Sequence, residues 1–344
     1  MRIVQVGLGN WGRYWLRRIL PQVPEAQIVG CVDVDPEALA LAREQVGVPA
    51  DCCFASLDAA LGSTEPDAVL VTTTLAHHVP VARAALESGL HVLVEKPFAP
   101  SLAEARALVE LADARGRVLM VSQNYRFFPA ARGAASLVAH GGMGALHEVE
   151  IDFRHRSVVT ETDGRRGHRA LEQPLLMDMS IHHFDLLRLV LGAEPERVDC
   201  HAWNPPWSGF DGPPSAVATI LFPGVVVSYR GSWLSWGQDT PWAGEWRMTF
   251  EQGEVSWTSR HLLGSTAAER VLVRPGAGEP HELTLPVVPL LDQAGSLAEF
   301  VDAVRTGREP ESSGRSNMGS LALALGAVES SEHGVPVTLP SGVT

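Results

Sequence analysis

The sequence has few cysteines, an excess of acid over base and no long apolar run, and each shortage excludes a class of protein. Its four cysteines lack the spacing of a metal site and the density of a disulfide framework. The formal charge is −13 and no basic block offsets it, which argues against a nucleic-acid partner. No apolar run is long enough to cross a membrane, so we expect no membrane partner. The first apolar run begins at Ile3 and leaves no room for a secretory signal, so we expect a reduced, cytoplasmic protein.

At 344 residues the chain is too long for one ordinary core and predicts two domains. In residues 1–123, apolar runs alternate with helical stretches, as a doubly wound parallel sheet of the Rossmann type requires. The expected strands are 3–6, 28–32, 68–72, 91–94 and 118–122, and the expected helices are 13–20, 79–88 and 102–115.

The pattern changes at residue 124. Short alternating runs separated by Gly/Pro turns predict an α+β domain over 124–344, with a large, open, mostly antiparallel sheet. Its expected strands are 146–156, 216–222, 225–233, 245–250, 254–257 and 269–273, and its expected helices are 130–140, 179–191, 294–306 and 316–331. The C-terminal helix is expected to pack back on the first domain. The polar stretch Arg154–Gln173 has no periodicity and is interpreted as a mobile loop near the site.

A glycine motif follows the first apolar run: Gly7-Leu8-Gly9-Asn10-Trp11-Gly12. In a strand–turn–helix unit the first glycine permits the turn, the second lets a pyrophosphate approach the backbone, and the third lets the helix pack closely on the strand. The next strand ends in Asp33, where a carboxylate binds an adenosine ribose and repels a 2′-phosphate. The motif therefore predicts NAD. The simpler alternative makes Asp33 a turn or helix cap before Pro36.

Two further groups of polar residues can carry chemistry. Lys96, in Glu95-Lys96-Pro97, follows a predicted parallel strand at the edge where open α/β sheets bind ligands, and it could stabilise an alkoxide. Taken alone, it could equally be a surface lysine. Asp178, His182 and Asp185 stand at i, i+4 and i+7, on one face of a helix.

A carboxylate beside an imidazole orients the imidazole and makes the imidazole a better base. The alternative is a helix N-cap at Asp178 and a structural histidine at position 182. His183 lies about 100° around the helix and is interpreted as a bystander. No third ligand at metal-binding spacing accompanies the pair, so we expect no metal.

Taken together, the glycine motif, Asp33, the stretch HVLVEKP and the pattern D-x-x-x-H-x-x-D resemble the glucose–fructose oxidoreductase/inositol dehydrogenase (Gfo/Idh/MocA) family. The resemblance covers nearly the whole chain. It implies that Lys96, Asp178 and His182 are catalytic. Its implied cofactor-binding residues are Gly7, Gly9, Asn10, Trp11, Gly12, Asp33, Thr72, Thr73, His78, Glu95, Lys96 and Asn124, and its implied substrate-binding residues are Lys96, Arg126, Arg154, Asp178 and His182.

Family subunits commonly associate through their open sheets, which implies a homo-oligomer, a dimer or tetramer, formed through the C-terminal sheet. Departures from the family pattern at Thr73-Thr74-Leu75 and at Ser180 leave the substrate open. Seven tryptophans gather in the second domain: Trp203, Trp207, Trp233, Trp236, Trp242, Trp246 and Trp257. Sugar rings stack on such side chains, but a core or interface role is favoured.

The sequence therefore predicts an NAD-dependent dehydrogenase that oxidises a secondary alcohol of a sugar, sugar derivative or cyclitol, with a small carbohydrate or polyol as its partner. NADP stays open because Arg13 and Arg43 lie near the motif. Two alternatives remain. One is a transient oxidation without net redox, as in glycoside cleavage or elimination. The other is a catalytically silent dinucleotide-binding sensor or co-repressor, which would be expected to lose the lysine or the histidine.

Overall fold

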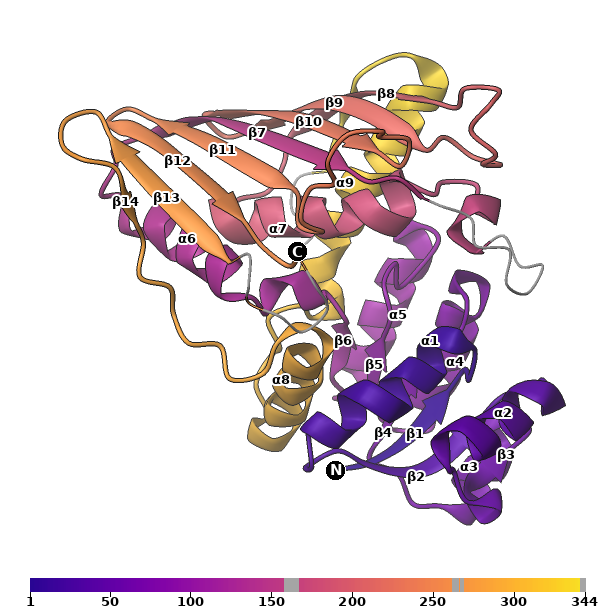
Figure 1. The fold of residues 1–344 in the computed structure, drawn as a ribbon. Helices are drawn as coiled ribbons and strands as arrows, with labels where there is room; N and C mark the ends of the chain where they lie inside the picture. The colour runs from indigo at the N-terminus through magenta and orange to yellow at the C-terminus, as the bar shows by residue number, and fades with distance from the viewer. Residues whose placement is uncertain (158–166, 262–265, 267–268, 341–344) are drawn as a thin grey trace. The chain divides into compact units, whose positions relative to one another are not determined.

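The computed structural model describes residues 1–157, 167–261, 266 and 269–340. The chain divides into two compact units, which are described separately below (Figure 1). Unit 1 contains Met1–Asn124 and Gln293–Met318, and unit 2 contains Tyr125–Asp292 and Gly319–Val343. The boundary expected at 123/124 lies next to the end of the first segment of unit 1. The second expected domain, 124–344, is interrupted, because Gln293–Met318 belongs to unit 1.

Unit 1 is built on a six-stranded parallel sheet in the order β3-β2-β1-β4-β5-β6. The strands are β1 Arg2–Val6, β2 Gln27–Val32, β3 Cys53–Phe54, β4 Ala68–Val71, β5 His91–Val94 and β6 Leu119–Val121. Strands β4 and β5 are apolar almost throughout and nearly fully buried, as parallel strands covered on both faces require. The predicted doubly wound Rossmann sheet is confirmed.

The helices of unit 1 are α1 Asn10–Tyr14, continued by a π turn Trp15–Ile19 and a 3₁₀ turn Leu20–Gln22, then α2 Pro36–Val46, α3 Leu57–Ser63, α4 Leu75–Glu87, α5 Leu102–Arg115 and nearly all of α8 Asp292–Thr306. The sequence predicted these helices except α2 and α3, which were not foreseen although each begins after a residue whose side chain caps it. Helix α4 begins four residues before the expected start at 79, which brings His78 into the helix. In the returning segment, Ser312 Oγ donates to the carbonyl of Val121 at 2.7 Å, next to β6.

Unit 2 is built on a nine-stranded sheet in the order β14-β13-β12-β11-β7-β10-β9-β8-β15. Its strands are β7 Leu146–Arg154, β8 Arg197–Trp203, β9 Ser215–Phe222, β10 Val225–Ser232, β11 Glu245–Phe250, β12 Gly253–Thr258, β13 Arg270–Pro275, β14 His281–Glu282 and β15 Val337–Thr338. Strand β7 pairs with β10 in parallel, and the other pairs are antiparallel. The expectation of a large, mostly antiparallel sheet is confirmed, although β8, β14 and β15 were not foreseen.

Helices cover one face of this sheet. Within unit 2, α6 Pro129–His140 and α7 Ile181–Leu191 lie against that face (Figure 1). Along β7 the apolar residues Val149, Ile151 and Phe153 are buried, and charged residues alternate with them. The ring of Phe153 lies 5.1 Å from that of His183 on α7, so this side of the strand faces the helices. Among the described residues, no helix is both long and apolar enough to cross a bilayer.

Candidate active site

The three glycines of the motif have three different environments. Gly7 has φ +98°, and a Cβ there would lie 2.6 Å from the amide nitrogen of Thr73. A Cβ on Gly12 would lie 2.0 Å from the carbonyl oxygen of Gly7. A Cβ on Gly9, at the N-cap of α1, would meet no atom within 4 Å. The turn is thus tight at the first and third positions and approachable at the second, as a pyrophosphate requires, so this loop fits a dinucleotide.

Two buried polar side chains brace this turn. Gln5, in the middle of β1, donates from Nε2 to the carbonyl of Gly12 at 2.8 Å and to Thr72 Oγ1 at 3.0 Å. Thr72 Oγ1 in turn donates to the carbonyl of Gly7 at 2.7 Å. The hydroxyl of Thr72, expected to bind the cofactor, therefore holds the cofactor loop in shape. Sequence analysis missed Gln5, although a lone amide within an apolar strand was a signal.

Asp33 ties the end of β2 to the glycine turn. Its Oδ2 accepts the N–H of Leu8 at 2.7 Å, and its Oδ1 accepts the N–H of Asp35 at 2.9 Å. The cap of α2 is Asp35, whose carboxylate accepts the N–H of Glu37. Each carboxylate oxygen keeps acceptor capacity for a ribose hydroxyl. Arg13 is buried and donates to the carbonyl of Leu8 at 2.6 Å and to Asn10 Oδ1 at 2.7 Å, within the turn itself.

Glu95 joins the end of β5 to the helix that follows the glycine turn. Its Oε1 accepts the indole N–H groups of both Trp11 and Trp15, each at 2.8 Å. Burial raises the pKa of the Glu95 carboxyl, because the charged form loses its solvation. Trp15, missed in the sequence, is fully buried. Lys96 follows directly, half-buried, with its peptide bond to Pro97 cis.

Lys96 is also the only lysine of the chain, since 26 of the 27 basic residues are arginines. This count is a signal in the sequence that motif analysis did not use. An ammonium is a compact, rotatable point charge, whereas a guanidinium is a planar fork. A guanidinium at position 96 would therefore not reproduce the geometry of this group.

His78 bridges the loops that follow β4 and β5. Its Nδ1 lies 2.7 Å from the carbonyl of Pro97, and its Nε2 lies 3.1 Å from the carbonyl of Thr73. Burial lowers the pKa of this imidazole. A neutral ring has one N–H and can donate to only one of the two carbonyls at a time. His78 therefore donates to one of these carbonyls and lies between the loop after β4 and the loop after β5, which includes Lys96.

In unit 2, Asp178 and His182 lie on one helical run that begins with a π turn, Leu176–Ser180, and continues as α7. The N–H of Ser180 donates to the carbonyl of Leu175 at 2.7 Å, the spacing of a π turn. Asp178 therefore lies inside the run, not at the N-cap that the simpler interpretation required. His182 is buried, and its ring stacks on Tyr125 with centroids 4.2 Å apart and planes 2° from parallel. Single π turns recur at functional sites.

Asp185, the third residue of the predicted helix face, has a structural partner. Arg126 donates to it through two nitrogens, at 2.6 Å and 2.8 Å, and Ser320 Oγ donates at 2.7 Å. Both members of the ion pair are buried. Arg126 was expected to bind substrate, but two of its guanidinium nitrogens donate hydrogen bonds to Asp185 on α7.

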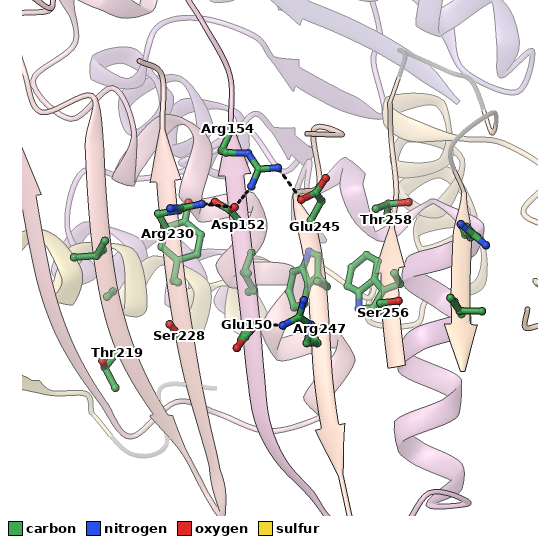
Figure 2. Close-up of a pocket in the computed structure, with 18 of the residues that line it drawn as sticks. Glu150, Asp152, Arg154, Thr219, Ser228, Arg230, Glu245, Arg247, Ser256 and Thr258 are labelled. Carbon is green, nitrogen blue, oxygen red and sulfur yellow. Dashed lines mark hydrogen bonds and ion pairs between the residues drawn. The ribbon is translucent and has the colours of Figure 1, made fainter. Parts of the chain in front are cut away.

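Arg154 does not lie with Asp178 and His182. It pairs with Asp152 and Glu245 on the outward face of the sheet (Figure 2). Phe153 lies on the opposite face, and its ring faces α7. The residue after Arg154, His155, lies on the same side of the strand as Phe153. Its ring stacks on Phe153 at 4.8 Å and on Trp242 at 4.3 Å, and burial lowers its pKa. Two-residue periodicity along β7 accounts for this placement.

The outward sheet face is a shallow hollow lined by paired charges (Figure 2). Opposite charges meet across neighbouring strands: Arg230 with Asp152 at 2.6 Å, Arg247 with Glu150 at 3.1 Å and Arg270 with Glu282 at 2.7 Å. These ion pairs join neighbouring strands across the outward face of the sheet.

The tryptophans divide between core and surface. Trp233, Trp246 and Trp257 are buried, and the last two stack at 4.4 Å, whereas Trp203, Trp207 and Trp236 are exposed. The core role is therefore confirmed for three of the seven. Residues 158–166, the middle of the expected mobile loop, lie outside the described part of the chain. Within the described part, no group of three or more His, Cys, Asp or Glu side chains could hold a metal ion.

Residues 1–123 match the oxidoreductase family with an NAD-binding Rossmann fold, and residues 131–256 match the GFO/IDH/MocA C-terminal domain. The N-terminal and C-terminal domain models of one family thus match the chain in order and cover most of it. The chain belongs to this family. The protein is an NAD(P)-dependent oxidoreductase of the kind that acts on CH–OH groups, and the predicted cofactor class is confirmed.

Two named relatives align with more than half of this chain. D-apiose dehydrogenase from Paraburkholderia graminis is 28% identical over 356 residues, covering 98% of this chain and 89% of that one. UDP-N-acetylglucosamine 3-dehydrogenase from Acidithiobacillus ferrooxidans is 32% identical over 203 residues, 58% of this chain and 56% of that one. A crystal structure of an oxidoreductase from Agrobacterium radiobacter, in complex with NAD+, L-tartaric acid and magnesium, has the same fold, with a TM-score of 0.81, 21% identity and 98% of each chain covered.

Proposed function

We propose that the protein is an NAD-dependent dehydrogenase that oxidises a secondary alcohol of a sugar, sugar derivative or cyclitol by reversible hydride transfer. The observation that carries the proposal is the single lysine of the chain, which stands directly after β5. Ligands of open α/β sheets bind at this edge. The names of the two relatives, dehydrogenases of D-apiose and of UDP-N-acetylglucosamine, support a carbohydrate substrate.

The bound nicotinamide would accept the hydride from the carbinol carbon. The glycine turn would hold the pyrophosphate, and Asp33 would accept hydrogen bonds from the adenosine ribose. His182 would take the hydroxyl proton, and Asp178 would orient the imidazole. The ammonium of Lys96 would stabilise the developing alkoxide at the same substrate carbon. Because Asp33 is anionic, the site would prefer NAD, whose ribose lacks a 2′-phosphate.

Two further properties belong to the same proposal. The outward face of the nine-stranded sheet would join copies of the chain into a homo-oligomer, since its alternating charges are complementary to themselves under a two-fold axis. The protein would be cytoplasmic, since its four cysteines carry free thiols, as a reducing compartment favours.

A substrate screen tests the reaction. Sugars, uronates, anhydrosugars and inositols are incubated with NAD or NADP, and reduced nicotinamide is followed by its absorbance while product is followed by mass spectrometry. The proposal expects NADH to accumulate in step with product. Product without NADH would indicate instead a transient oxidation with no net redox change. NAD binding without any turnover would indicate instead a dinucleotide-binding sensor.

A further inference from the structure

Two buried residues of unit 2 share a rare backbone conformation. Among the described residues, Arg260 and Asp292 are the only non-glycine residues with positive φ, 57° and 59°. They also contact each other, because Arg260 Nη2 lies 3.2 Å from Asp292 Oδ2 and both side chains are almost fully buried. A left-handed backbone at a non-glycine residue persists only where the surroundings hold it, and it recurs at functional sites.

The backbone at Arg260 is held by a third side chain. The Glu269 carboxylate accepts the N–H of Arg260 at 2.7 Å and the hydroxyl of Ser259 at 2.9 Å. It also accepts the N–H of Ala130, in the first turn of α6, at 2.8 Å. Arg260 is therefore fixed at its main chain as well as at its guanidinium.

Arg260 in turn fixes Tyr125. Its Nη1 donates to the Tyr125 hydroxyl at 2.9 Å, and its guanidinium carbon lies 4.3 Å from the centre of the tyrosine ring. The cation therefore holds both the hydroxyl and the π face of one ring. Burial raises the pKa of Tyr125, so the phenol stays protonated and neutral.

The tyrosine ring is the surface on which His182 stacks. The two rings lie 4.2 Å apart and within 2° of parallel, so a tilt or shift of Tyr125 would carry the imidazole with it. Tyr125 and Asp292 are also the residues at which the long segment of unit 2 begins and ends. Arg260 thus ties both ends of that segment to the ring beneath His182.

We propose that Arg260 is a positioning residue: with Asp292 it fixes Tyr125 as a rigid platform that sets the orientation of the His182 imidazole for proton transfer. The inference rests on the proposed function, in which His182 is the base. Proton transfer requires the base within hydrogen-bond reach of the hydroxyl, and a misplacement of about 1 Å can cost about 100-fold in rate. Arg260 itself does not touch the substrate in this proposal.

The first experiment measures the geometry and needs no substrate. The protein is labelled with ¹³C at histidine Cε1, and the His182 signal is assigned by its loss in His182→Asn. The ring current of Tyr125 is expected to shift this signal upfield in the parent protein. In Arg260→Met the shift is expected to diminish, and in Tyr125→Leu to vanish. The control Arg188→Met removes another buried arginine, which lies on the same helix as His182. Arg188 binds Glu194 and Ser320, and its Nη1 lies 4.0 Å from Asp185 Oδ1. The control is expected to leave the signal unchanged.

The second experiment measures turnover with a substrate from the screen. Arg260→Met is expected to lower kcat by about 10- to 100-fold with the Kd for NAD unchanged. Arg260→Lys is expected to recover part of this loss, because it restores the charge but not the fork. Tyr125→Phe is expected to lose less than Tyr125→Leu, because the ring remains. If Arg260→Met does not fold, Arg260→Lys and Tyr125→Leu carry the same comparison.

An unmoved His182 signal in folded Arg260→Met would overturn the inference whatever the enzyme's substrate. A moved signal with unchanged kcat would overturn it differently: the platform would exist, but His182 would not be the base, and the proposed function would fail at that residue. Equal losses in Arg260→Met and Arg188→Met would reduce the effect to general destabilisation and would also overturn it.

Discussion

A Cβ atom on Gly12 would lie 2.0 Å from the carbonyl oxygen of Gly7, closer than any non-bonded contact allows. Gly12→Ala must therefore move the backbone of the turn, and overpacking of this kind costs about 1–3 kcal/mol. We expect a lower melting temperature without cofactor and a loss of NAD affinity, measured by thermal unfolding and calorimetry.

Gly9→Ala is the matched control for that variant. Its Cβ would meet no protein atom within 4 Å, so the melting temperature without cofactor should stay the same. A methyl group at this position would obstruct the pyrophosphate, and we expect the Kd for NAD to rise about tenfold or more, which is about 1.4 kcal/mol. Unchanged NAD binding in Gly9→Ala would mean that the pyrophosphate does not bind at this turn.

Local sequence signals determined the parts of the fold that were predicted best. Helix α5 begins after Ser101, whose hydroxyl accepts the N–H of Glu104, and ends before Gly116 at φ 61°, so both ends were readable in the sequence. The two-residue strands β14 and β15 have no such signals. They exist because β13 and β8 offer free edges, and the sequence does not show a long-range pairing of this kind.

The structure shows where the predicted site residues lie and what they contact, and two of these placements were not readable in the sequence. The glycine turn behaves as its motif predicts because its requirements are local. Asp185 was placed on the catalytic face, but its partner Arg126 lies 59 residues earlier in the sequence, and nothing local signals that pair. Arg154 was predicted to bind substrate, but the two-residue alternation along β7 places it on the face opposite Phe153.

Lys96 can be tested with unusual selectivity because the chain has no other lysine. Lys96→Met should lower kcat by about 100- to 1000-fold, the cost of removing one charge-stabilising donor, with little change in the Kd for NAD. Lys96→Arg should not restore the rate, because a planar guanidinium does not occupy the place of an ammonium. A parental kcat in Lys96→Met would refute the proposed role.

The same residue allows a second readout. In protein labelled with ¹⁵N-lysine, the side chain of Lys96 gives the single ammonium resonance. We expect this resonance to shift when a substrate from the screen is added to the NAD complex. A resonance that responds to neither NAD nor substrate would place Lys96 away from the reaction.

Glu95 should make the stability of the protein depend on pH in an identifiable way. Its pKa is raised by burial, so the native state holds a proton that the unfolded state releases. The contribution of Glu95 to the free energy of unfolding therefore falls as pH rises from the ordinary glutamic acid pKa to the raised native pKa. Above the native pKa this contribution no longer changes with pH. Glu95→Gln keeps an oxygen for both indole N–H groups and has no titrating proton.

The difference in melting temperature between Glu95→Gln and the parent should thus grow in favour of the glutamine variant across that pH window and then level off. Thermal scans from pH 4 to pH 8 measure it. A difference that stays constant with pH would mean that the Glu95 carboxyl has the same pKa in the native and unfolded states.

The outward sheet face gives a prediction about association. Arg247 lies on β11, with Glu150 at 3.1 Å and Glu254 at 3.7 Å. Arg247→Glu would bring three carboxylates together. Within one chain the loss is small, because an exposed ion pair contributes about 0–1 kcal/mol. Across an interface of two copies, like charges brought together cost several kcal/mol, so we expect the oligomer to dissociate.

Sedimentation of the parent and variant measures this at equal protein concentration. Arg305→Glu makes the same charge change on α8, where the exposed Arg305 forms an ion pair with its helix neighbour Asp302, and it should leave the mass unchanged. The melting temperature should separate dissociation from unfolding. A parent that sediments as a monomer, or an Arg247→Glu oligomer as stable as the parent, would place the interface elsewhere, because a charge reversal at the centre of a two-fold contact is repeated in both copies.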